Sequence, residues 1–284
     1  MAHSRKLILA FAALLLATAT LALAQGTYTQ IDYPGALDTY CNGIDTAGDI
    51  SGYYIDATGG YGFLLSNGTY TSIAHPDSTN TELFGMNDVG EVVGYSSVGF
   101  SYNVATQKFT TISFPNAYIT FPFAVNDSGT VVGYIEGENN VKLGFQLNSS
   151  GRGTSIFLPG ALDTETYGIT TAGEVVGSAY DRGGPYVNFS FEKGKYKTAL
   201  PNVQGAIVLG INPAGTALVG YYTLHFPAGF LYQSETITTL QFPDSIQTIA
   251  NGVNNVGEVV GSFEDSSGNI HGFTWTPPAD AAKK

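Results

Sequence analysis

The residues of this sequence best suited to binding chemistry are carboxylates and tyrosines grouped around a repeated hexapeptide. The hexapeptide PGALDT occurs at residues 34–39 and again 125 residues later, at residues 159–164. Carboxylates accept hydrogen bonds from hydroxyl groups and tyrosine rings offer apolar faces, so such a set suits a sugar ligand. The ligand-binding residues predicted on this basis are Tyr33, Asp38, Tyr40, Asp163, Glu165 and Tyr167. The plainer interpretation, duplication of a three-repeat unit that carries ordinary solvated acids, stays open.

Residue patterns typical of catalysis or metal binding are missing from the sequence. His75, His225 and His271 stand far apart, and neither a His-x-x-x-His nor a Cys-x-x-Cys spacing occurs. A Gly-x-Ser-x-Gly nucleophile motif is also absent. The single cysteine, Cys41, lies in an apolar segment and is predicted to be a core residue without a disulfide. We therefore predict no catalytic residue, no metal ligand and no cofactor.

The sequence is strongly acidic, with Lys+Arg 11 against Asp+Glu 23 and a formal net charge of −12. Nucleic-acid binding needs basic residues that neutralise phosphates, so this balance argues against a nucleic-acid partner. The same charge repels anionic membranes. The expected partner is an extracellular glycan or a protein, and the chain is expected to be a monomer.

A segment of the form GIND-x-x-G-x-VVG recurs along the whole chain and indicates the architecture. Successive copies are 42, 39, 44, 42 and 42 residues apart, with their Asn position at Asp45, Asn87, Asn126, Thr170, Asn212 and Asn254. A period of about 42 residues is typical of the four-stranded blades of β-propellers. We therefore predict an all-β fold, a six-bladed β-propeller of four-stranded blades. Two three-repeat sandwiches or barrels are the alternative architecture.

Each repeat is predicted to hold four short strands, a to d. Strand a ends in an Asx-x-x-Gly turn such as Asn87–Gly90, which is type I turn chemistry with glycine in the left-handed position. The alternating oxygen ligands of a calcium loop are absent from these turns. Strand b follows as VVG, where the glycine indicates a bulge or a close backbone approach. Strand c carries a Phe and a second large residue two positions later, which places both on one face for burial between blades.

The two ends of the mature chain predict how the ring closes. An orphan strand d, residues 27–32, precedes the first complete repeat, and the last repeat finishes with strand c at residues 272–276. Pairing these two segments completes the sixth blade and removes the free edges of an open array. We therefore predict that the N-terminal strand pairs with the C-terminal strand in the last blade.

The recurring GIND-x-x-G-x-VVG, followed by GF and T-x-I-x-x-P, resembles the extracellular HAF repeats of soil and environmental bacteria. The resemblance covers about residues 27–275, and the fourth copy departs most, with Thr170 for Asn and Asn188-Phe189 for Gly-Phe. It implies an extracellular repeat protein. It carries no established activity or catalytic residues over to this sequence.

The N-terminus has the features of an export signal. Arg5 and Lys6 precede a 13-residue apolar run at residues 7–19, and Ala22-Leu23-Ala24 supplies a small-residue cleavage pattern. The run is shorter than the ~20 residues of a membrane-spanning helix. We predict a signal peptide at residues 1–24, a single six-repeat domain at residues 25–278 and a short disordered tail at residues 279–284, in a secreted or periplasmic protein.

Two functional hypotheses follow. The first is a secreted, non-enzymatic propeller that binds an extracellular carbohydrate or protein through one loop face, formed by the d-to-a and b-to-c connections. The alternative is a glycan-active hydrolase or lyase that uses carboxylates of that face, because glycosidases need two carboxyl groups ~5 to 9.5 Å apart.

Overall fold

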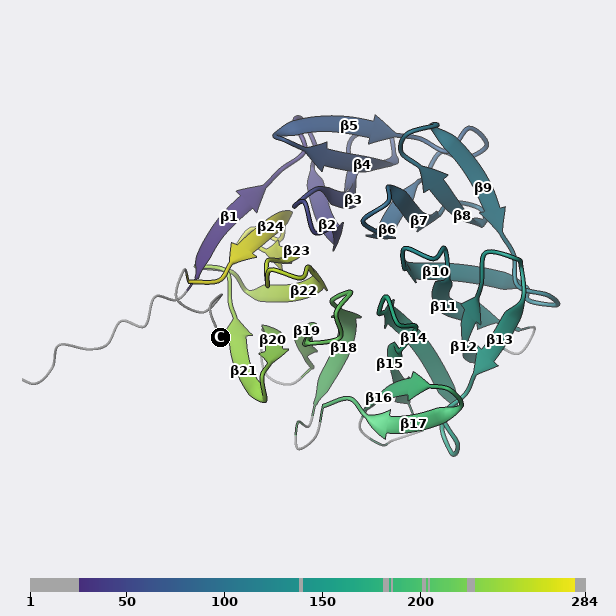
Figure 1. Ribbon diagram of the computed structural model, residues 1–284. Helices are drawn as coiled ribbons and strands as arrows, with labels where there is room; N and C mark the ends of the chain where they lie inside the picture. The colour runs from purple at the N-terminus through teal and green to yellow at the C-terminus, as the bar shows by residue number, and fades with distance from the viewer. Residues whose placement is uncertain are drawn as a thin grey trace, which may run out of the picture.

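The described part of the chain forms a ring of six blades. The computed structural model describes residues 26–137, 140–180, 184, 186–200, 203, 205–223 and 228–278. These residues build six four-stranded antiparallel sheets around a central axis (Figure 1). The predicted six-bladed β-propeller is confirmed, and the alternative of two sandwiches or barrels is wrong. The predicted signal peptide (residues 1–24) and tail (residues 279–284) lie outside the described residues.

Within each of blades 1 to 5, the strands follow chain order from the axis outwards, so that strand a is innermost and strand d is outermost (Figure 1). Blade 1 holds β2(Asp38–Ile44), β3(Ile50–Ile55), β4(Gly60–Ser66) and β5(Thr69–Ile73); blade 2 holds β6(Glu82–Met86), β7(Glu91–Tyr95), β8(Gly99–Asn103) and β9(Lys108–Ile112). Blade 3 holds β10(Ile119–Val125), β11(Val131–Glu136), β12(Lys142–Leu147) and β13(Gly153–Ile156); blade 4 holds β14(Asp163–Ile169), β15(Val175–Tyr180), β16(Val187–Glu192) and β17(Lys195–Thr198). Blade 5 holds β18(Ala206–Ile211), β19(Ala217–Tyr222), β20(Gly229–Gln233) and β21(Thr236–Leu240).

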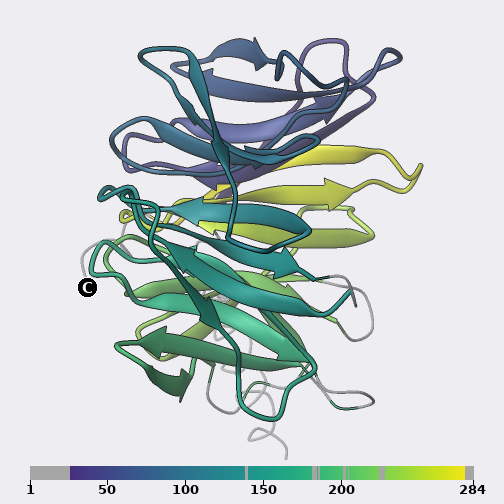
Figure 2. The same ribbon diagram turned by 90° about the vertical axis from the view of Figure 1, so that its right-hand side faces the viewer.

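Blade 6 joins the two ends of the chain. It consists of β22(Gln247–Val253), β23(Val259–Glu264), β24(Ile270–Thr276) and, as its outer strand, β1(Thr27–Ile31). β1 runs antiparallel to β24, with Thr27 opposite Thr276 and Ile31 opposite Gly272. Both views place the purple N-terminal strand beside the yellow C-terminal strands (Figures 1 and 2). The predicted ring closure is confirmed.

The core lies between the blades. Each strand c contributes one phenylalanine that is at most 1% exposed: Phe63, Phe100, Phe145, Phe189, Phe230 and Phe273. The two valines of VVG point to opposite faces of the blade, as period two requires. In blade 3, Val131 packs in the cluster shared with blade 2, whereas Val132 packs in the cluster shared with blade 4. Burial on both faces explains why strand b is apolar without alternation.

The glycine that ends VVG marks a close backbone approach, as predicted. A Cβ atom on Gly133 would lie 1.9 Å from the carbonyl oxygen of Phe121 on strand a, and one on Gly52 would lie 1.9 Å from that of Tyr40. Strand a bulges two residues later, where the pairing register shifts between Cys41 and Gly43 in blade 1. Any side chain at this glycine would therefore push strand a away from strand b.

The two ends of the ring differ in the connections that they carry. We call the end with the d-to-a and b-to-c connections the loop face. The other end, with the a-to-b turns and c-to-d hairpins, is the turn face. The six a-to-b turns have glycine at positive φ in the last position, at Gly48, Gly90, Gly129, Gly173, Gly215 and Gly257, as the type I chemistry predicts.

These six turns also bond to one another, and together we call them the turn belt. Asn126 shows the principle: its Oδ1 accepts the backbone N–H of Thr130 in its own turn (3.0 Å), while its Nδ2 donates to the carbonyl of Thr170 in the next blade (3.0 Å). Bonds of this belt cross every junction between blades: Thr46 to Asp88, Asn87 to Asn126, Asn126 to Thr170, Thr171 to Pro213, Ala214 to Asn255 and Asn254 to Asp45. The repeated Asn is therefore both a turn residue and a link between blades.

Replacing Asn126 by Asp should separate these two roles. Aspartate keeps the Oδ1 acceptor of the turn, but it has no Nδ2 donor. The carbonyl of Thr170 then keeps only the N–H of Gly173 in its own turn (3.0 Å) and faces a carboxylate oxygen in place of the amide. We expect a loss of about 1–3 kcal/mol in the free energy of unfolding, measured by urea denaturation. Asn148→Asp is the control, because the side-chain hydrogen bonds of Asn148 in the described structure stay within its own exposed hairpin. Equal unfolding midpoints for the two variants would contradict a linking role for Asn126.

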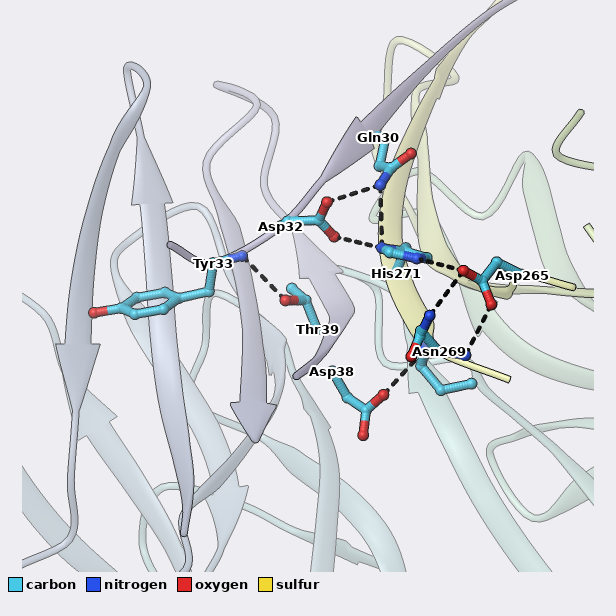
Figure 3. Close-up of polar contacts among 9 residues, drawn as sticks. Gln30, Asp32, Tyr33, Asp38, Thr39, Asp265, Asn269 and His271 are labelled. Carbon is cyan, nitrogen blue, oxygen red and sulfur yellow. Dashed lines mark hydrogen bonds and ion pairs between the residues drawn. The ribbon is translucent and has the colours of Figure 1, made fainter. Parts of the chain in front are cut away.

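A histidine between two aspartates ties β1 to the last blade (Figure 3). His271 on β24 contacts Asp32 through Nδ1 (2.8 Å) and Asp265 through Nε2 (3.5 Å), and Gln30 donates to Asp32 (2.7 Å). Burial alone would lower the pKa of His271, but its hydrogen bonds to the two carboxylates and their charges outweigh burial and raise that pKa above 6.5. The hydrogen bonds from Asn269 are the main reason that the pKa of Asp265 falls to about 2.

Stability should therefore depend on pH through His271. A raised folded-state pKa means that the stabilising contribution of His271 is complete below pH 6.5, the unfolded value, and is lost as pH rises through the folded value. We expect the gap in urea midpoint between the wild type and His271→Gln to be largest in mildly acidic buffer and to shrink in alkaline buffer. Asp32→Asn should remove most of the same pH-dependent gap. A gap that does not change with pH would contradict this assignment.

Candidate functional site

The inner strands line a channel along the axis of the ring, and this channel holds a cavity of ≈ 340 Å³. Each inner strand runs from the loop face to the turn face, so its first residues lie at one end of the channel and its last residues at the other. Tyr40, Tyr53 and Tyr167 line the cavity from the loop-face side. Asp88 and Asp127, in the a-to-b turns, line it at the turn face. The channel is therefore the hollow part of the molecule on which a site can be built.

Aromatic rings and carboxylates alternate at the loop-face end of the inner strands. Tyr40 stacks on Tyr53 with ring centroids 4.4 Å apart, and Tyr95 stacks on Phe121 at 4.0 Å. Phe121 also contacts Tyr134 at 4.9 Å. We call these rings and the four carboxylates among them the mouth cluster: Tyr40, Tyr53, Tyr95, Phe121 and Tyr134, with Asp38, Glu82, Glu136 and Glu165.

Among the described residues, one lysine neutralises part of this negative charge. Lys142 at the start of β12 lies 2.6 Å from Glu165 and 4.6 Å above the ring of Tyr134. The hydroxyl of Tyr167 donates to the same Glu165. Burial, followed by the charge of Glu165, raises the pKa of both Tyr134 and Tyr167. These phenols therefore act as hydrogen-bond donors at neutral pH, and they are not bases.

The structure brings only part of the predicted site together. Tyr40, Glu165 and Tyr167 lie at the loop-face end of the channel, where Tyr40 and Tyr167 line the cavity. Tyr33 lies apart from them: its ring stacks on Tyr54 at 3.6 Å within the core between blades and points away from Asp38 (Figure 3).

Asp38 and Asp163 perform the same structural task in blades 1 and 4. Asp38 accepts the backbone N–H of Ile270 in blade 6 (3.0 Å), and Asp163 accepts that of Lys142 in blade 3 (2.9 Å). Each aspartate of the hexapeptide thus binds the blade before it. In each carboxylate, the Oδ1 atom accepts this hydrogen bond.

The threonine of the hexapeptide is structural as well. Thr39 and Thr164 accept the backbone N–H groups of Tyr33 (3.0 Å) and Leu158 (3.1 Å), which closes the d-to-a connection. The same bond occurs at Thr81, Thr120 and Thr248. These contacts give the aspartate and the threonine of the hexapeptide a role in the frame, which agrees with the plainer interpretation of PGALDT.

Sequence reasoning missed several members of the mouth cluster, among them Tyr53, Tyr95 and Tyr134. The signal for them was available, because a tyrosine directly follows the VVG-type glycine in four repeats: Tyr53, Tyr95, Tyr134 and Tyr221. No sequence pattern marks Lys142, because only the folded position of β12 brings its side chain to the mouth cluster.

No carboxylate among the described residues of the loop face is singled out as a catalytic acid. Burial raises the pKa of the Asp45 carboxyl, but Asp45 lies in the turn belt at the opposite end of the channel. Among the described residues, no group of three or more His, Cys, Asp or Glu side chains is arranged to hold a metal ion. No helix long and apolar enough to cross a membrane occurs in that part of the chain either.

Comparisons with known proteins show the fold. No protein-family model matches the chain and no curated protein matches it, so the resemblance to HAF repeats stays a prediction. Among solved structures, TolB from Acinetobacter baumannii aligns with a TM-score of 0.54 and 12% identity, over 82% of this chain and 64% of that one. The gluconolactonase XC5397 from Xanthomonas campestris aligns with a TM-score of 0.55 and 8% identity, over 88% and 94% of the two chains.

A third similar structure is the SapL1 lectin in complex with alpha methyl fucoside. It aligns with a TM-score of 0.53 and 13% identity, over 86% of this chain and 94% of the lectin. The chain spans less than two thirds of the TolB structure and nearly all of the other two. At such identities these likenesses establish a β-propeller and nothing finer.

The buried phenols of the channel give a direct spectroscopic prediction. Burial is the main cause that raises the pKa of Tyr53, Tyr134 and Tyr167, so these three should stay protonated above the ordinary tyrosine pKa of about 10. In an ultraviolet titration of the native protein, we expect at least three of the 18 tyrosines to ionise only at more alkaline pH. The same titration in strong denaturant should show all of them ionising near 10. Complete ionisation near 10 in the native protein would contradict the buried positions.

Proposed function

We propose that this chain is a non-enzymatic binding protein that takes a carbohydrate at the mouth cluster. The observation that carries the proposal is the alternation of aromatic rings with carboxylates at one end of the channel. The edges and faces of Tyr40, Tyr95 and Phe121 suit the C–H surfaces of a sugar ring. The carboxylates of Glu82 and Glu136 can accept hydrogen bonds from its hydroxyl groups.

The charge of the cluster narrows the class of sugar. In the described part of the chain, Asp38, Glu82, Glu136 and Glu165 face one cation, Lys142, which Glu165 already binds. Repulsion between like charges disfavours polyuronates and sulfated glycans. The proposed ligands are therefore neutral or cationic saccharides, and the free carboxylate oxygens of Asp38 and Asp163 are available to the same ligand.

A second candidate, a protein partner, is favoured by the rim of the loop face. Equivalent positions of four d-to-a connections expose large apolar side chains: Leu37 is 64% exposed, Tyr118 78%, Leu162 38% and Ile246 43%. Exposed apolar groups gathered on one face are typical of protein-binding surfaces. The rim therefore supports protein binding in the same way that the mouth cluster supports sugar binding.

An enzymatic role has less support. A hydrolase or lyase needs a carboxyl group held ready to exchange a proton, but Asp38 and Asp163 each accept a backbone N–H of the neighbouring blade.

The proposal also includes the location of the protein. The predicted signal peptide supports carbohydrate binding outside the cytoplasm, in the periplasm or the medium.

Thermal unfolding of the purified protein against a panel of oligosaccharides tests the function. A ligand at about 100 times its dissociation constant stabilises the native state by about 2.7 kcal/mol. For a domain of this size, each kcal/mol shifts Tm by roughly 2 to 4 °C. We expect a saturable shift with a neutral or amino sugar and none with oligogalacturonate.

Variants then locate the site. Tyr95→Ala and Glu82→Gln should abolish the shift, whereas Tyr118→Ala, which removes an exposed ring from the rim, should leave it intact. Loss of the shift in Tyr118→Ala alone would move the site to the rim. The absence of a shift with every sugar would overturn carbohydrate binding and leave the protein partner.

A further inference from the structure

We propose that the turn-face half of the channel is a second binding site, which takes a small, neutral, aromatic molecule or aryl group of about two fused rings. This site adjoins the mouth cluster, since Tyr40 and Tyr53 line the loop-face end of the same cavity, and its ligand enters from the turn face. The argument rests on the wall of the cavity, its volume and the charge at its rim.

The wall of this half is mostly apolar, although several asparagines, one threonine and two aspartates contribute to it. The last residues of the inner strands form an aliphatic ring around the axis, made of Ile44, Met86, Val125, Ile169, Ile211 and Val253. One level closer to the loop face, Phe84, Phe123 and Leu209 continue the apolar lining. Phe84 and Phe123 lie 4.9 Å apart and leave ring edges and faces for an aromatic guest.

The polar groups in the wall are already satisfied by the protein. Asn251 donates its Nδ2 to the carbonyl of Cys41 (3.0 Å), and Asn42 donates to the carbonyl of Leu83 (2.8 Å). Asn87 and Asn126 donate their Nδ2 groups to backbone carbonyls within the turn belt. Water needs two to four polar partners to be held in a cavity, so this wall favours an apolar guest over ordered water.

The volume sets the size of the guest. An apolar cavity of about 150 Å³ binds benzene. The whole channel, including the part lined by Tyr40 and Tyr53, offers ≈ 340 Å³, so a guest seated in the turn-face half can extend towards those rings. This total is roughly the lower bound for small-molecule sites in proteins. This space suits two fused rings with a short substituent, and it is too small for a long acyl chain folded on itself.

The rim on the turn face selects against anions. Asp88 and Asp127 line the cavity where it reaches the turns, and Asp45 lies in the same belt. No Lys or Arg is among the described residues that line the cavity. An anionic guest would lose hydration in the apolar wall and would also meet these carboxylates, so the guest is neutral.

A matched pair of fluorescent probes tests the site directly. N-phenyl-1-naphthylamine is neutral, and 8-anilino-1-naphthalenesulfonate has the same rings plus one sulfonate. We expect the neutral probe to bind with a stoichiometry of one and to become strongly fluorescent. We expect the anionic probe to bind at least about tenfold more weakly, a difference of 1.4 kcal/mol.

The repeat itself supplies a blocking variant that the fold should accept. Leu209 occupies the position at which blades 2 and 3 carry Phe84 and Phe123, so Leu209→Phe fills the channel with a residue native to that position. We expect the affinity for N-phenyl-1-naphthylamine to fall at least about tenfold with Tm unchanged or raised. Leu37→Phe on the exposed rim is the matched control.

The results divide cleanly. Binding that survives Leu209→Phe, or that is lost in Leu37→Phe, would place the probe on the outer surface and overturn the proposal. So would the absence of binding, or equal affinities for the two probes. Failure of every sugar to bind would leave this site standing, because its aliphatic ring and the probe fluorescence do not involve the carboxylates of the mouth cluster.

Discussion

The bond from one a-to-b turn to the next is the interaction on which the rest of this structure depends. Six inner strands must approach closely enough to share one axis, and the turn belt fixes their separation at the turn face. Asn126 does so with one side chain, whose Oδ1 shapes its own turn and whose Nδ2 reaches Thr170 in the next blade. The width of the channel, and hence the existence of a cavity within it, follows from that spacing.

The features that define the blades could be predicted from the sequence because each one is visible within a few consecutive residues. Gly90 ends a type I turn, Gly133 lies against a neighbouring carbonyl, and Thr27 begins the orphan strand at the N-terminal end of the repeats. The contacts between blades leave no such mark. Asp38 looks like a free carboxylate in PGALDT, yet its partner Ile270 lies 232 residues away.

The candidate site was harder to foresee for a related reason. Stability requires that the blades be alike, whereas the mouth cluster and the cavity wall use the positions where they differ. The fourth blade illustrates the point, because Asn188 replaces the usual glycine of Gly-Phe. Its side-chain Nδ2 donates to the carbonyl of Ala206, and its Oδ1 accepts the backbone N–H of Val208, both in blade 5. Only the folded structure shows that Asn188 strengthens the junction between blades 4 and 5. It also shows that Tyr95 and Glu82, by contrast, belong to the mouth cluster at the surface.

The ring closed by β1 has a consequence for the order in which the protein can form. The first strand of the described chain finds its partner only in the last, with Thr27 opposite Thr276, so the most distant contact in the chain completes the final blade. Contacts of such sequence separation form late and slowly. A nascent chain therefore cannot complete the ring before β24 has been made, and until then it remains in an open form.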